Sequence, residues 1–162
     1  MSYHTPPAPH ATLISTQTQS IASAASAQVV TFNSVLDSAG ITLGSSTRVV
    51  LPQVGNYCFT FSAIGHNSGS SNAKWLNIYF KKNGSDVENS STIVGTAKDA
   101  PTTIVATFDL PCTTVGDYYE VWMAGQDTGS QILATPAQAA VPGVSPAMPA
   151  CPSIVLAVWQ IS

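Results

Sequence analysis

Short runs in which apolar and polar residues alternate limit what this chain can fold into more than any other feature. In the segment 57–64, the aromatic residues at positions 57, 59 and 61 are separated by single small or polar residues. A period of two is the repeat of a β-strand, and no segment has the i, i+3, i+4, i+7 apolar spacing of a helix over three turns. The predicted strands are 28–32, 41–43, 47–51, 57–64, 74–81, 91–95, 102–110, 118–124 and 153–161.

Turn signals between these runs narrow the fold class. Asn83-Gly84 is a strong tight-turn signal, because both residues tolerate positive φ. Short strands with a turn about every 8–12 residues are typical of sandwiches and jelly rolls. The prediction is therefore all-β: a jelly-roll β-sandwich of about 8–10 antiparallel strands. The Pro-rich segment 135–152 is expected to be a long irregular loop.

The alternation also predicts which side chains face inward. The predicted sandwich core consists of Tyr57, Phe59, Phe61, Leu76, Ile78, Phe80, Phe108, Leu156 and Val158. The last predicted strand differs from the others, because both of its faces are apolar. One face should be polar in a sandwich whose outer face meets water. The second face is therefore expected to contact another molecule, and a neighbouring subunit is the simplest candidate.

The first 27 residues differ in composition from the rest. Pro6, Pro7 and Pro9 fix φ and lack backbone donors, and the segment 12–27 contains few large apolar side chains. Such a segment cannot form a core of its own. The predicted organisation is an extended Pro/Ser/Thr/Ala-rich arm over 1–27 and a jelly-roll domain over 28–162.

Charged residues make up only 8% of the chain, against about 25% in an average globular protein. Two explanations remain open. Much of the surface is hidden in an assembly, which the depletion of charge at interface cores favours, or Ser, Thr, Asn and Gln cover it instead. With a net charge of −3, no nucleic-acid partner is expected, because phosphate binding needs clustered cations. The only adjacent cations, Lys81 and Lys82, are interpreted as a solvated strand end.

Targeting signals are not recognisable in this sequence. The start lacks a basic region followed by an apolar run, and no stretch approaches membrane-spanning length. We therefore expect synthesis in the cytoplasm and no membrane partner.

No group of residues has the pattern of a catalytic or metal site, so the sequence predicts no enzyme, no metal and no cofactor. His4, His10 and His66 lie in the arm or in a loop, where nothing holds a base beside a nucleophile. Asp86 and Glu88 follow a turn, and solvation explains them better than a role as a paired acid and base.

Aromatic residues on the predicted strands suggest an alternative. Trp75, Tyr79 and Trp122 are candidates for a glycan platform, although core or subunit contacts are the commoner role of aromatics in β-sandwiches. Glu120 is expected to face outward with its aromatic neighbours. A glycan ligand thus stays an alternative without a supporting motif.

The cysteines give no metal or disulfide framework, because they are three in number and have no CxxC spacing. Cys112 and Cys151 both lie in loop-like segments. They form either a disulfide or two free thiols.

Three pieces of the sequence together resemble the tumour necrosis factor and complement globular-head superfamily. They are Gly55-x-Tyr57-x-Phe59-x-Phe61, Gly116-Asp117-Tyr118 and Ser153-Ile154-Val155-Leu156-Ala157. More narrowly, the chain is similar to compact domains in structural proteins of tailed bacteriophages. That similarity rests on Phe61-Ser62-Ala63, Trp75, Lys82-Asn83-Gly84, Asp86-Val87 and Ser90. The resemblance covers residues 28–162 and implies a jelly roll that forms a threefold trimer through its inner sheet.

These observations lead to one functional hypothesis and one alternative. The chain is expected to be a virion structural protein, a capsid decoration or cement protein that binds the outer capsid surface as a homotrimer, with the major capsid protein as partner. The alternative is a receptor- or glycan-binding tip of a phage head or tail fibre. The trimer interface is predicted at Cys58, Thr60, Val155, Ala157, Trp159 and Ile161. Attachment of the arm to the capsid is predicted at Tyr3, Pro6, Pro7, Pro9, Leu13 and Ile14.

Overall fold

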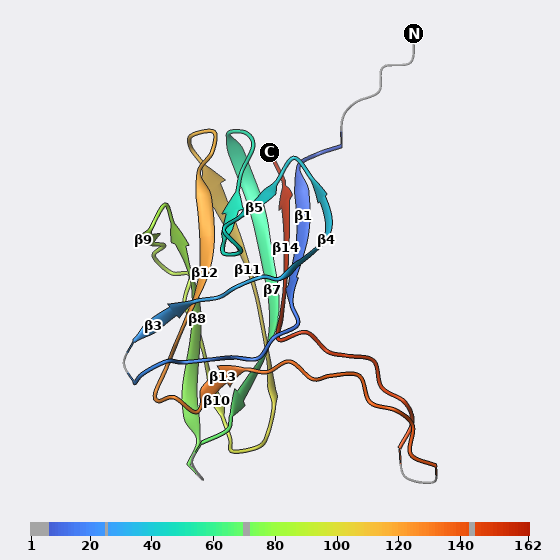
Figure 1. Ribbon diagram of the computed structural model, residues 1–162. Coiled ribbons are helices and arrows are strands. Elements are labelled where there is room, and N and C mark those ends of the chain that lie inside the picture. The colour runs from blue at the N-terminus through green and yellow to red at the C-terminus, as the bar shows by residue number, and fades with distance from the viewer. Residues whose placement is uncertain (1–6, 25, 70–71, 143–144) are drawn as a thin grey trace.

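The computed structural model describes residues 7–24, 26–69, 72–142 and 145–162. Within these ranges the chain is all-β, with two antiparallel sheets and no helix (Figure 1). The sheets face each other and enclose one apolar core, which confirms the predicted jelly-roll sandwich. None of the described segments is a helix long and apolar enough to cross a membrane.

One sheet, called the β7 sheet here, has the strand order β2-β13-β7-β14-β1-β4, and a further strand, β11, also pairs with β7. Its strands are β1 (His10–Ser15), β2 (Gln19–Ser20), β4 (Ser34–Ala39), β7 (Gly55–Asn67), β11 (Thr102–Cys112), β13 (Ser130–Ile132) and β14 (Ile154–Gln160). Strand β11 pairs along its whole length with residues 55–65 of β7, and β14 pairs with β7 on the other side. β14 therefore lies in the middle of the sheet, between β7 and β1.

The second sheet, called the β12 sheet, has the order β10-β8-β12-β6-β5, with β3 on β12 and β9 on β8. Its strands are β3 (Ala27–Val29), β5 (Thr42–Gly44), β6 (Arg48–Val50), β8 (Lys74–Lys82), β9 (Ser85–Asp86), β10 (Thr92–Thr96) and β12 (Tyr118–Gly125). The predicted turn Asn83-Gly84 joins β8 to β9, and both residues have positive φ, 50° and 85°.

The core forms where the inward rows of the two sheets meet. Phe59, Phe61 and Phe80 are fully buried, and the ring centroids of Phe59 and Phe80 are 5.4 Å apart in an edge-to-face arrangement. Such aromatic pairs add about 0.5–1.5 kcal/mol beyond the area they bury. The predicted core is confirmed: eight of its nine residues are buried, and Phe108 is partly buried against them.

The prediction of an arm over 1–27 is wrong from His10 onward. Strand β1 pairs with β4 and β14 inside the β7 sheet, and Leu13 is 1% exposed. Beyond β1, the buried Gln19 side chain donates to Ser15 Oγ and to the Thr31 carbonyl, and it accepts from the Thr31 N–H. The burial of alternate residues of β1 and the hydrogen bonds of the Gln19 amide thus hold this segment in the sandwich, although it is too polar to fold alone.

Two expectations about the segment before β14 also need correction. The described residues 134–142 and 145–152 are not irregular: Thr135, Gln138 and Val141 pair with Cys151, Met148 and Ser145, respectively, in an antiparallel ribbon. Cys112 and Cys151 are free thiols. Cys112 is buried at the end of β11, whereas Cys151 is exposed in the ribbon, so the disulfide alternative is wrong.

Candidate functional site: the outer face of the β7 sheet

The predicted trimer-interface residues lie together on the face of the β7 sheet that points away from the core. The β7–β14 register places Trp159 beside Cys58 and Ala157 beside Thr60. Val155 lies one step further along the same face of β14. Ile161 follows the end of β14 and is 49% exposed. The structure brings these side chains together, as the alternation predicts.

Strand β11 continues the same surface on the far side of β7. Its residue Thr107 lies beside Thr60, and the two hydroxyl groups are 2.8 Å apart in a hydrogen bond. Val105, on the same face two residues earlier, is 59% exposed. One hydroxyl of the Thr pair donates to the other, so part of the polar capacity of this area is already used within the chain.

Strand β1 extends the surface on the other side of β14. The pair Ser15–Ile154 and the hydrogen bond from the Gln160 N–H to the Pro9 carbonyl fix the register of β1 against β14. That register places Ile14 beside Val155 on the outer face. We name the residues Ile14, Cys58, Thr60, Val105, Thr107, Val155, Ala157, Trp159 and Ile161 the contact face.

The apolar row of β14 on the contact face is flanked by charged groups, because Asp109 of β11 lies beside Cys58 in the β7–β11 register. Burial raises the pKa of the Cys58 thiol, which keeps it protonated at neutral pH. On the other side of β14, His10 Nε2 is 3.1 Å from the Asp37 carboxylate. The hydrogen bond to the Ala8 carbonyl raises the pKa of His10 most, and the nearby Asp37 carboxylate raises it further. The uncharged outer row of β14 thus lies between charged positions on β11 and on β1, and depletion of charge at the core with a polar rim is typical of protein contacts.

The arrangement of histidines gives no nucleophile beside a base. His66 Nδ1 lies 2.9 Å from the Gln131 side-chain amide, and His10 is held by Ala8 and Asp37. His4 lies outside the described residues. Across the described ranges, no group of three His, Cys, Asp or Glu side chains could hold a metal ion.

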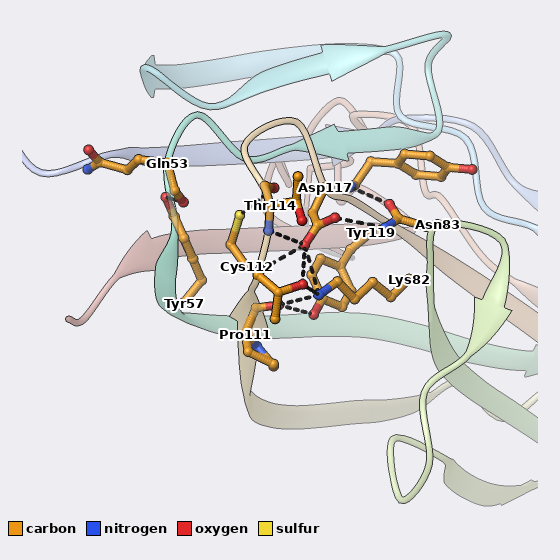
Figure 2. Close-up of polar contacts among 11 residues, drawn as sticks. Gln53, Tyr57, Lys82, Asn83, Pro111, Cys112, Thr114, Asp117 and Tyr119 are labelled. Carbon is orange, nitrogen blue, oxygen red and sulfur yellow. Dashed lines mark hydrogen bonds and ion pairs between the residues drawn. The ribbon is translucent and has the colours of Figure 1, made fainter.

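A polar network at one end of the sandwich was not foreseen (Figure 2). The Asp117 carboxylate lies 2.8 Å from Lys82 Nζ, and it accepts hydrogen bonds from Asn83 Nδ2 and from the N–H groups of Thr113 and Thr114. Although burial acts to raise its pKa, these donors hold the pKa of Asp117 well below its usual range. The carboxylate therefore stays ionised and fastens the β11–β12 turn to the β8–β9 hairpin.

The sequence contained a signal for this network. Gly116-Asp117-Tyr118 and Lys82-Asn83-Gly84 were noted as separate motifs, and the structure brings them into contact. The interpretation of Lys82 as a solvated strand end is wrong, because its side chain is only 22% exposed and ion-paired. Lys81 has similar exposure, and its Nζ lies 4.3 Å from the centroid of the Trp122 ring.

The outer face of the β12 sheet carries the candidate glycan platform. Trp75 is exposed, Tyr79 and Trp122 are half-buried, and register places Trp122 beside Tyr79. Glu120 faces the same way as expected, but it is buried beneath its neighbours, accepting from Trp122 Nε1 and pairing with Arg48.

The predicted capsid-attachment residues do not form one surface. Tyr3 and Pro6 lie outside the described residues. Pro7 and Pro9 line a pocket beside Gln160 at the end of the sheet. Leu13 is buried in the core, so its assignment to attachment is wrong.

The comparisons with known proteins give the fold and nothing finer. No family model matches the chain, and no curated protein matches it. Among solved structures, the globular domain of zebrafish complement 1qA protein matches at 18% identity, with a TM-score of 0.51 over 96% of this chain and 98% of that one. Murine APRIL at pH 5.0 matches at 10% identity, with a TM-score of 0.59 over 96% of this chain and all of the other.

A second structure of murine APRIL, at pH 8.5, matches at 9% identity and a TM-score of 0.55, covering 95% of this chain and 100% of that one. At these identities the likeness is one of fold. The chain has the jelly-roll fold found in C1q globular domains and tumour necrosis factor ligands.

Proposed function

We propose that the protein is a non-enzymatic structural module that self-associates as a homotrimer through the contact face. The observation that carries this proposal is the apolar outer row of β14. Strand β14 is central in its sheet, yet Val155, Ala157 and Trp159 cover the side that points away from the core. A central strand with both faces apolar is typical of a sheet covered on both sides.

The number of subunits follows from the fold resemblance rather than from the contact face alone. A resemblance to the complement and tumour necrosis factor heads implies a threefold arrangement through this sheet. An apolar patch of this kind is the feature that marks association surfaces on soluble proteins. A closed ring of three covers the contact face of every copy and leaves none exposed.

The finer proposal places this trimer on a particle. We propose that it decorates the outer capsid surface of a tailed-phage virion and binds the major capsid protein. Two features support this: the similarity of the β7 and β8–β9 motifs to phage structural domains, and a charged fraction of only 8%. The segment with Tyr3, Pro6, Pro7 and Pro9 remains the proposed attachment segment.

Reconstitution tests the capsid proposal. Capsids that lack the protein are mixed with the full chain and with a truncation that begins at His10, and bound protein is measured after sedimentation of the particles. The proposal expects the full chain to bind and the truncation to wash off while it stays trimeric. If neither form binds any capsid, the decoration role is wrong.

A second candidate, glycan binding, is favoured by a specific feature of the β12 sheet. A pocket of about 400 Å³ is lined by Asn77, Tyr79, Asp86, Glu88, Asn89 and Ser91, among others. The lining offers carboxylate, amide and hydroxyl groups, which are partners that sugar hydroxyls can bind. Titration with a panel of oligosaccharides, with Tyr79→Ala as the binding-deficient variant, distinguishes this function from a purely structural one.

A further inference from the structure

The ribbon, residues 134–142 and 145–152, has a three-residue repeat in both its sequence and its hydrogen bonds. The first branch reads Thr-Pro-Ala, Gln-Ala-Ala, Val-Pro-Gly, and the second Ser-Pro-Ala, Met-Pro-Ala, Cys-Pro-Ser. The first residue of each triplet pairs across the ribbon: Thr135 with Cys151, Gln138 with Met148 and Val141 with Ser145. In each pair both N–H groups donate to the opposite carbonyl at 2.9–3.0 Å.

A repeat of three is that of a polyproline II helix, whereas hydrogen-bonded pairs in an ordinary antiparallel ladder recur every two residues. Proline at the second position of a triplet costs no pairing, because that position needs no donor. The two branches therefore support each other as a stiff, extended hairpin, about 20 Å long from Thr135 to Val141 at the rise of polyproline II.

The surface of the ribbon is unusual for an exposed element. Residues 133–152 contain no Asp, Glu, Lys, Arg or His. Residues 136–142 and 146–150 are exposed, and the large side chains Val141 and Met148 are 50% and 45% exposed. Figure 1 shows the ribbon extending away from the sandwich at the end opposite the C-terminus. An ordered, uncharged projection of this kind is typical of a surface that a partner covers.

The two ends of the ribbon, where it joins the sandwich, indicate where that partner lies. The Leu133 N–H donates to the Ile64 carbonyl at 2.8 Å, and the Ile64 N–H donates to the Ser153 carbonyl at 3.0 Å. The ribbon thus leaves from the middle of the β7 sheet and leads directly into β14. Only two residues separate Pro152 from Val155 on the contact face, a span of about 10 Å at full extension.

A neutral pocket continues from the contact face to the ribbon. It has a volume of about 350 Å³ and lies between the root of the ribbon and the end of β1, with Ile14, Thr16, Pro136 and Cys151 among its lining residues. Ile14 belongs to the contact face as well. The apolar surface is therefore continuous from β14 and β1 onto the ribbon, and a copy that covers one part lies against the other.

We infer that the ribbon is an assembly element, which packs against a neighbouring copy of this chain beside the contact face. This inference rests on the proposed homotrimer. Since the pairing fixes the ribbon before association, little conformational entropy is lost when a neighbour covers it. The ribbon then extends the interface beyond the sandwich and strengthens the trimer.

Two variants and one control test the inference by sedimentation equilibrium. In the first, residues 136–150 are replaced by Asn-Gly, which closes the hydrogen-bonded pair Thr135–Cys151 with a two-residue turn. In the second, Val141→Glu and Met148→Glu place charges on exposed positions without disturbing the core. The matched control is Val115→Glu, at a residue 65% exposed in the turn between β11 and β12.

We expect both ribbon variants to dissociate at concentrations at least tenfold higher than the wild type, while the control dissociates at the wild-type concentration. As dissociated chains, all variants should keep the wild-type urea midpoint. A ribbon-deleted trimer that is as tight as the wild type would overturn the inference. The same holds if that trimer has lost capsid binding, because the inference concerns contacts between copies of this chain. A wild-type chain that is monomeric at every concentration instead overturns the proposed homotrimer, and the inference with it.

Oxidation of Met148 gives an independent readout that needs no change in the ribbon. Peroxide converts exposed methionine to its sulfoxide, and coverage slows this reaction. We expect Met148 to oxidise several-fold more slowly in the wild-type trimer than in a monomeric Trp159→Arg variant, as followed by peptide mass spectrometry. Equal rates in the two forms would contradict coverage by a neighbouring copy.

Discussion

The two faces of strand β7 differ in what they contact, although they alternate along the same backbone. Inward-facing Phe59 and Phe61 are fully buried against the β12 sheet. Outward-facing Thr60 is only partly buried, and the neighbouring outward Trp159 of β14 is 38% exposed. The inner face is complete within one chain, whereas the outer face is not. The inner row therefore sets the stability of the chain, and the outer row sets its association.

The largest expected effect is on the inner face. Phe59→Ala removes a fully buried ring that contacts Phe80 and Tyr119. We expect a loss of about 3–5 kcal/mol in the free energy of unfolding, from lost transfer energy and the cavity that remains. Urea melts of the dissociated chain measure this. A loss below that of Cys58→Ser would mean that the two faces of β7 are assigned the wrong way round.

The next effect concerns the polar network at the end of the sandwich. Asp117→Asn removes the charge that Lys82 and two backbone N–H groups contact. We expect a loss of about 2–3 kcal/mol at pH 7, because hydrogen bonds to a charged group contribute about 1.5–3 kcal/mol.

The pH dependence of that loss follows from the direction of the pKa shift. The pKa of Asp117 is lower in the folded chain than its ordinary value of 3.8. Its contribution is therefore fully present above that value and declines as the pH falls below about 4. Urea melts at pH 7 and at pH 3 should bring the wild type closer to Asp117→Asn at the lower pH. A constant difference between the two proteins would contradict this assignment.

A smaller effect is expected on the outer face of β7. Cys58→Ser should cost about 1 kcal/mol or less in the dissociated chain, because the thiol packs against no residue of the opposite sheet. The backbone position directly beside Phe59 makes it the matched control for Phe59→Ala. An equal loss for both substitutions would show that the contact face stabilises the monomer as much as the core does.

Sequence alone predicted the strands that have one strongly apolar row, and it missed those that lack one. The central parts of β7 and β8 bury aromatic or branched residues at every second position, and the inward row of β11 is apolar, so the period of two is visible in all three strands. In β4, Val35 and Leu36 are both exposed, and no alternation marks an edge strand of this kind. β1 did carry a signal, because the buried Ala11 and Leu13 alternate with partly buried residues, but proline-rich and polar neighbours concealed it.

The β14 part of the contact face could be predicted because it lies on one strand, whereas the polar network could not. The outer row of β14 is visible as a second apolar row in a single segment. By contrast, Asp117 is 34 positions from Asn83 and one more from Lys82. No local pattern specifies which cation reaches which carboxylate. Long-range polar pairs depend on sheet order, which alternation leaves open.

The central claim is that the outer row of β14 joins three copies of the chain, and Trp159 tests it most directly. Sedimentation equilibrium at micromolar concentration should give three chains for the wild type. Trp159→Arg should give one, because association would bury an unpaired charge in each copy at a cost of several kcal/mol per ion. Urea melts should give Trp159→Arg a free energy of unfolding within about 0.5 kcal/mol of that of the dissociated wild type. A wild type that sediments as a single chain, or a Trp159→Arg variant that sediments as three, would contradict the account.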